Sequence, residues 1–164
     1  MALPRSNHAR PGGHFDSLEQ EVFLNLWRTY DRLRAFEDAL FSQHDLTPQQ
    51  YNTLRLLKGD HPNKIHTLDL ASRLVSRAPD ITRLLDKLEQ RGFIDRDRPA
   101  ENRRIVRIGI TSAGLELLEK LRAPILNCHA QQLGHLTRHQ LTELVGLLRA
   151  ARQPHEVNES AWKQ

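Results

Sequence analysis

The sequence predicts a mainly α-helical protein with one small β-hairpin. Apolar residues recur every three or four positions along most of the chain, which is the spacing of amphipathic helices. The segment "RRIVRIGIT" instead alternates from one residue to the next, which is typical of a strand. Between Asp69 and Thr111, ten Lys or Arg residues accompany seven Asp or Glu residues, so this segment carries three of the four net positive charges. The function of a basic hairpin in a helical protein is therefore the main question.

The first predicted helix covers residues 16–42. Leu18, Val22 and Leu26 lie on one apolar stripe of this helix. At about 1.5 Å per residue it would be roughly 40 Å long, which exceeds the size of a small domain, so we expect part of the stripe to pack on another molecule. The polar residues 1–15 lack the apolar segment of a signal peptide. We interpret them as a flexible arm and the protein as cytoplasmic.

The second helix is predicted to begin in "LTPQQYNTLRLL". Thr47 is a suitable N-cap, Pro48 fits the first helical position and Gln50 completes a capping box. Gly59 is the predicted stop. The segment "DHPNK" reads as a loop.

Two short helices follow, the first from about Thr67 to Leu74. The second has Ser76 as its expected cap and Pro79 in its first turn, and Gly92 ends it. Two short helices joined by a tight turn form a helix-turn-helix. The strands "FIDRDRP" and "RRIVRIGIT", on either side of the loop "AENR", convert this into a winged helix-turn-helix.

The last third of the chain is predicted to be helical again. Thr111 can cap a helix in which Pro124 should cause a bend or an interruption. Thr137 and Gln140 form a second capping box, which begins the last helix. Residues 153–164 are predicted to be disordered.

The polar face of the second short helix is suited to the major groove of DNA. Arginine can bridge guanine O6 and N7, and Thr or Lys can reach phosphates or base edges. The candidate residues of this recognition helix are Ser76, Arg77, Ala78, Pro79, Asp80, Thr82, Arg83 and Lys87. Asp86 is expected to pair with Arg83 or Lys87, one helical turn away.

The hairpin tip is suited to the minor groove, where the negative potential attracts a guanidinium group. Arg103 is the best candidate for insertion, and Arg98 or Arg104 would contact the flanking backbone. Asn102 precedes the paired arginines and completes this group of wing candidates.

The stretches "LTPQQYNTLRLL", "DLASRLVSRAPDITRLLDKLEQRGFIDR" and "DRPAENRRIVRIGIT" resemble the MarR (multiple-antibiotic-resistance regulator) family of bacterial transcription factors. The resemblance covers about residues 46–112. It implies a homodimer that binds a pseudo-palindromic operator, represses transcription and is released by a small aromatic or phenolic effector. The sequence departs from the family at Asn102, where an Asp is usual; an Asp would pin the wing arginine by a salt bridge, whereas Asn can only hydrogen-bond.

The resemblance also implies that the first helix and the last two helices form the dimer interface. Its expected residues are Leu18, Val22, Leu26, Ile125, Leu141, Leu144, Val145 and Leu148. Trp27, Tyr30 and His44 are candidates for an effector pocket or, alternatively, for plain interface or core packing. The chain then divides into an arm (1–15), a dimerisation helix (16–45), a winged helix-turn-helix DNA-binding region (46–111), C-terminal dimerisation helices (112–152) and a flexible tail (153–164).

Other functions compete with DNA binding as interpretations of this sequence. A winged-helix protein-interaction module is one alternative, but the arginines of the wing favour nucleic acid. A redox-sensing regulator would depend on Cys128, the only cysteine. The i, i+4 pair His135 and His139 spans the cap at Thr137, so we expect no metal site or other cofactor. No Gly-rich phosphate loop, nucleophile elbow or zinc-hydrolase motif occurs, which indicates that the protein is not an enzyme.

Overall fold

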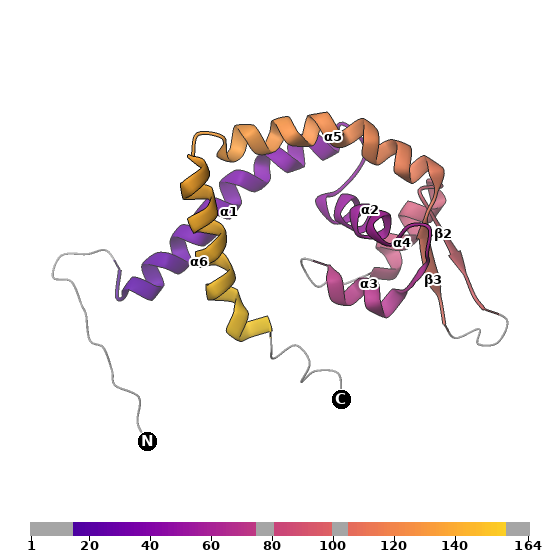
Figure 1. Cartoon of the computed structure of the whole chain (residues 1–164), viewed down its shortest axis with the longest axis horizontal. Helices are drawn as coiled ribbons and strands as arrows, with labels where there is room; N and C mark the ends of the chain where they lie inside the picture. The colour runs from indigo at the N-terminus through magenta and orange to yellow at the C-terminus, as the bar shows by residue number, and fades with distance from the viewer. Residues whose placement is uncertain (1–14, 75–80, 100–104, 157–164) are drawn as a thin grey trace, which may run out of the picture. The chain divides into compact units, whose positions relative to one another are not determined.

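A computed structural model of the chain describes residues 15–74, 81–99 and 105–156 (Figure 1). Six helices and three short strands occur in these ranges, so the expectation of a mainly helical protein with a small sheet is confirmed. Their order is α1 (Leu18–Ser42), α2 (Pro48–Asp60), β1 (Ile65–His66), α3 (Thr67–Arg73), α4 (Ile81–Gln90), β2 (Ile94–Asp97), β3 (Arg107–Ile110), α5 (Ser112–Leu133) and α6 (Arg138–Glu156).

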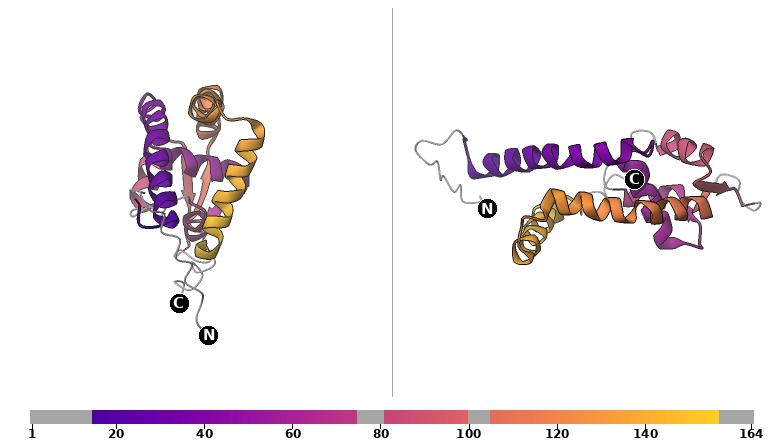
Figure 2. Two further views of the ribbon diagram at one scale, coloured as in Figure 1. Left: turned by 90° about the vertical axis from the view of Figure 1, so that its left-hand side faces the viewer. Right: turned by 90° about the horizontal axis from the view of Figure 1, so that it is seen from above.

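The chain divides into two compact units, residues 1–121 and 122–164. The first unit contains α1 to α4, the sheet and the beginning of α5, and the second contains the rest of α5 together with α6. Within the first unit, α1 extends well beyond α2, α3 and α4 (Figure 2). The N-terminal part of this helix therefore has few neighbours in its own unit.

The sheet has three antiparallel strands in the order β1-β3-β2. Ile108 of β3 lies between Ile65 of β1 and Arg96 of β2 in the register. The sequence predicted a two-stranded hairpin and missed β1, because a strand of two residues is too short to show alternation. The paired parts of β2 and β3 are also shorter than the predicted strands.

The core of the first unit joins its helices to its sheet. Aliphatic side chains from α2, α3, α4, β2, β3 and the beginning of α5 have almost no exposed surface. They include Leu54 and Leu57 of α2, Leu70 of α3, Leu85 and Leu88 of α4, Ile94 of β2, Ile108 of β3 and Leu121 of α5. Since burial of one such side chain stabilises a fold by about 1.5–3 kcal/mol, this cluster fixes α4 against β2 and β3.

The predicted helix ends are largely confirmed. Thr47 and Gln50 form the reciprocal capping box of α2. Gly92 has a φ of 72° after α4, and the N–H groups of Gly92 and Phe93 donate to the carbonyls of Glu89 and Leu88. This is the Schellman arrangement, which requires the left-handed conformation that glycine adopts without strain. The predicted stop at Gly59 was wrong, because α2 continues to Asp60.

In the second unit, α6 begins at the capping box that Thr137 and Gln140 form. Of the bend or interruption that Pro124 was expected to cause in α5, the interruption does not occur. The prediction of a disordered tail from residue 153 was wrong at its beginning, because α6 continues through Pro154 to Glu156. Tertiary packing and favourable neighbours can maintain a helix through the loss of one N–H donor.

Candidate nucleic-acid interface

Helix α4 has one buried side and one exposed side. Successive residues of a helix are about 100° apart, so the buried Leu85 and Leu88 place Arg83 and Lys87 toward the opposite side and Thr82 at its edge. All three of these polar residues are exposed. The described part of the recognition helix therefore presents a hydroxyl group, a guanidinium group and an ammonium group to solvent, as the sequence predicted.

Several predicted DNA contacts lie outside the described residues. These are Ser76, Arg77, Ala78, Pro79 and Asp80, which precede α4, and Asn102, Arg103 and Arg104, which lie between β2 and β3. Arg98, which directly follows β2, is exposed. Arg107 at the start of β3 is exposed as well and lies opposite Asp97. It was not selected from the sequence, although it adds a cation at the base of the wing.

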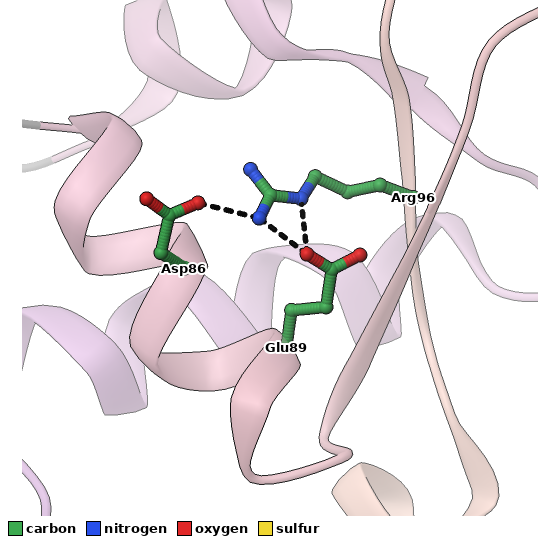
Figure 3. Close-up of polar contacts among 3 residues, drawn as sticks. All are labelled: Asp86, Glu89 and Arg96. Atoms are coloured by element: carbon green, nitrogen blue, oxygen red, sulfur yellow. Dashed lines mark hydrogen bonds and ion pairs between the residues drawn. The ribbon is translucent and has the colours of Figure 1, made fainter.

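Arg96 of β2 joins the wing to α4 (Figure 3). Its Nε donates to Glu89 Oε2 at 2.8 Å, and its Nη2 donates to Asp86 Oδ1 at 2.5 Å and also to Glu89 Oε2. The hydrogen bonds to Glu89 and then to Asp86 raise the pKa of the guanidinium above its usual value. The structure thus gives Asp86 a partner that the sequence did not suggest, on a different element.

A second ion-pair cluster connects the segment before β1 to β2. Lys64 Nζ lies 2.6 Å from Asp95 Oδ2 and 3.2 Å from Asp97 Oδ2. The hydrogen bond to Asp95 is the main cause that raises the pKa of Lys64. Gly109 of β3 makes this approach possible, because a Cβ there would lie 2.9 Å from Lys64 Cγ. These ion pairs therefore link the two outer strands, β1 and β2, at the base of the wing.

Arg91, just after α4, contacts the turn between α1 and α2. Its two terminal nitrogens donate to the backbone oxygens of Asp45 at 2.5 Å and His44 at 3.1 Å. The guanidinium also lies 4.8 Å from the centre of the Phe93 ring, within cation–π range. Arg73 of α3 pairs with Asp60 of α2 at 2.6 Å. The helix-turn-helix is therefore attached by side chains to the elements that precede it.

The effector-pocket candidates are not brought together within one chain. Trp27 and Tyr30 are largely exposed on α1, at 61% and 64%. His44 lies just beyond the end of α1. At about 1.5 Å per residue, Trp27 and His44 are roughly 25 Å apart. A small ligand in one chain could not contact both.

The expected interface residues differ in exposure. On α1, Leu18, Val22 and Leu26 are 64%, 50% and 40% exposed. Val145 of α6 is 47% exposed, whereas Leu141, Leu144 and Leu148 are half-buried. Ile125 of α5 is buried at 8%. The clearest uncovered apolar face in the described chain is therefore the N-terminal half of α1.

The described residues give little support to a redox-active cysteine, a metal site or a membrane span. Cys128 is buried at 7%, which limits the access of an oxidant to its thiol. Within residues 15–74, 81–99 and 105–156, no three His, Cys, Asp or Glu side chains are grouped as metal ligands. Among these same residues, no helix combines the length and apolar character that a membrane span requires.

The comparisons with known proteins agree with this geometry. A model of the MarR family matches residues 46–106. The chain is similar to a MarR transcription factor from Planctomyces limnophilus, with 53% identity, a TM-score of 0.67, and coverage of 83% of this chain and 98% of that one. It is 28% identical to the HTH-type transcriptional regulator YkoM of Bacillus subtilis (strain 168), over 84% of this chain and 90% of that protein. The fold also matches a mutant MarR from Escherichia coli in complex with operator DNA, with 20% identity, a TM-score of 0.71, and coverage of 82% and 98%.

Proposed function

The chain belongs to the MarR family of DNA-binding transcriptional regulators, and we propose that it acts as a homodimeric repressor on a pseudo-palindromic operator. The observation that carries the proposal is the exposed polar face of α4 beside a basic wing. A helix with this exposure fits the major groove, which is wide enough to admit it. The family consists of transcription regulators, so the chain is proposed to read DNA without catalysis.

Each group on this face has a role that follows from its chemistry. Arg83 reads guanine through O6 and N7, and Thr82 and Lys87 contact phosphates or base edges. The residues that precede α4, Arg77 among them, enter the groove first. Arg103 inserts into the minor groove at the wing tip, where the phosphates of both strands attract a guanidinium.

The homodimer follows from the uncovered apolar face of α1. Exposed Leu18, Val22 and Trp27 lie on a helix that extends past its own unit. Large contiguous apolar patches on a soluble protein mark interaction sites. A two-fold dimer places two copies of α4 in successive major grooves of a symmetric site.

Binding-site selection from a random pool of DNA duplexes tests this proposal. We expect enrichment of a two-fold symmetric motif whose half-sites lie about one helical turn apart. An asymmetric single half-site would contradict the dimeric arrangement. A pool that stays random after several rounds would contradict sequence-specific binding itself.

The wing assignment predicts that Arg103→Ala weakens binding to the selected duplex by about 1–3 kcal/mol, the range for one strong groove contact. Fluorescence anisotropy of a labelled duplex measures this change. Arg34→Gln, which removes one cation from an exposed pair on α1, is the control for net charge. Equal affinity of Arg103→Ala and wild type would contradict minor-groove insertion.

We further propose that a small aromatic or phenolic effector releases the DNA. In a protein of the same fold, BpsR of Bordetella bronchiseptica (20% identical), 6-hydroxynicotinic acid regulates DNA binding. The exposed Trp27 and Tyr30 could contact such a ring when a second chain completes the pocket. Anisotropy of the protein–DNA complex is measured against a panel of aromatic acids and phenols that includes 6-hydroxynicotinic acid. Concentration-dependent release by one compound supports the proposal, and retention of DNA against the whole panel contradicts it.

A further inference from the structure

The described part of the recognition helix carries no net charge of its own. In residues 81–90, Arg83 and Lys87 are balanced by Asp86 and Glu89. Asp86 is about 60° around the helix from Arg83 and about 40° from Thr82, so it lies within the exposed face. Its side chain is 57% exposed. An unpaired carboxylate at this position would face the phosphates and oppose binding.

Arg96 reaches these carboxylates from outside the helix. It comes from β2, and its guanidinium lies between Asp86 and Glu89, with bonds to both (Figure 3). The Arg96 side chain is only 21% exposed, whereas those of Asp86 and Glu89 are 57% and 40% exposed. The cation is thus placed behind the two acids, on the side away from solvent, and it does not compete with them for the DNA-facing surface.

We propose that Arg96 is a positioning residue for DNA binding, which pairs with Asp86 and Glu89 and thereby changes the net charge of the α4 face from zero to +1. The inference rests on the proposed function and adds a residue that has no contact with DNA. The planar guanidinium suits this position, because its Nε donates to Glu89 while its Nη2 donates to both Glu89 and Asp86.

The test uses three variants: Arg96→Gln, the double variant Asp86→Asn with Glu89→Gln, and the triple variant that combines them. Affinity for the selected duplex is measured by anisotropy. Arg96→Gln should raise the Kd about tenfold or more, because it returns the net charge of this face to zero and removes the guanidinium that binds Asp86 and Glu89. The triple variant should bind no more than about threefold more weakly than wild type, because Arg83 and Lys87 then have no acid beside them.

This recovery distinguishes neutralisation from a merely structural role. If Arg96 only supported the fold, or if it contacted DNA itself, Arg96→Gln would weaken binding by the same factor in wild type and in the double variant, and the proposal would be overturned. Equal affinity of Arg96→Gln and wild type would also overturn it. If Arg96→Gln does not fold, Arg96→Lys takes its place; its ammonium lacks the planar fork, so it should bind more weakly than wild type, and a smaller loss in the background of the double variant remains the criterion. Arg34→Gln is the control for loss of one cation and should bind like wild type.

The same series is titrated against a short duplex of unrelated sequence at low salt, where phosphate contacts dominate affinity. If wild type selects no specific duplex but the loss and recovery appear on this duplex, the proposed operator recognition fails and the role of Arg96 stands. If wild type binds its selected duplex tightly but the variants show no loss and recovery on either duplex, the role of Arg96 fails alone.

Discussion

Gly114, in the first turn of α5, has almost no room for a side chain. A Cβ at this position would lie 2.6 Å from Ile110 Cγ1 and closer still to the backbone oxygen of Phe93. A backbone atom cannot move aside as a flexible side chain can. The start of α5 therefore packs directly on Phe93, which precedes β2, and on Ile110 at the end of β3.

We predict that Gly114→Ala destabilises the protein by about 2 kcal/mol, within the range for overpacking. Chemical denaturation monitored by circular dichroism measures the free energy of unfolding. Gly59→Ala is the matched control, because a Cβ there meets no described atom within 4 Å and the residue is helical. The control should be neutral or stabilising by up to about 1 kcal/mol. Equal changes in the free energy of unfolding for Gly114→Ala and Gly59→Ala would contradict the close packing of Gly114 on Phe93 and Ile110.

Residues whose role depends on near neighbours in sequence could be predicted. Thr47 with Gln50, Thr137 with Gln140, and Gly92 were assigned correctly, because each acts within about four residues. The partners of Arg96 could not be predicted in this way. Glu89 and Asp86 are seven and ten residues away, and only the packing of β2 on α4 brings them together.

At the scale of elements, Arg91 attaches the end of α4 to the turn between α1 and α2. Arg91→Met retains the aliphatic stem but removes the donors to His44 and Asp45, whose carbonyls are 46–47 residues away in sequence. We predict a loss of about 1 kcal/mol in stability, since both acceptors can recover a bond to water.

Denaturant midpoints measure this change. Arg55→Met is the control, because Arg55 bonds locally, to Asn52 on the same helix. The control should change stability by less than about 0.5 kcal/mol. If Arg91→Met lowers the stability no more than the control does, the hydrogen bonds of Arg91 to His44 and Asp45 contribute nothing to stability.

The long helices and the winged helix-turn-helix could be predicted, because their apolar periodicity extends over many residues. The elements that were wrong or missed carry weak local signals. β1 has two residues, so its pairing with β3 is fixed by tertiary contacts. Pro124 and Pro154 are unfavourable in helices by local rules, yet α5 and α6 continue through them. The dimer and effector assignments came from the family resemblance and stay predictions.

At the scale of the whole molecule, the exposed face of α1 predicts an assembly of two chains. Leu18 is 64% exposed, so Leu18→Glu should leave the fold of one chain intact and weaken only the association between chains. We expect monomers in sedimentation velocity. Leu68→Glu is the control, because Leu68 is 82% exposed on α3, and it should stay dimeric. A dimeric Leu18→Glu at the same concentration would count against this interface.

A competition titration shows whether α4 and the wing read a DNA sequence. The anisotropy of the labelled selected duplex is followed at physiological salt with an excess of unrelated DNA. We expect nanomolar binding that survives the competitor and is lost when one half-site is scrambled. Binding that is equally weak on the scrambled duplex and disappears steeply with salt would reflect phosphate attraction alone and would contradict sequence-specific binding.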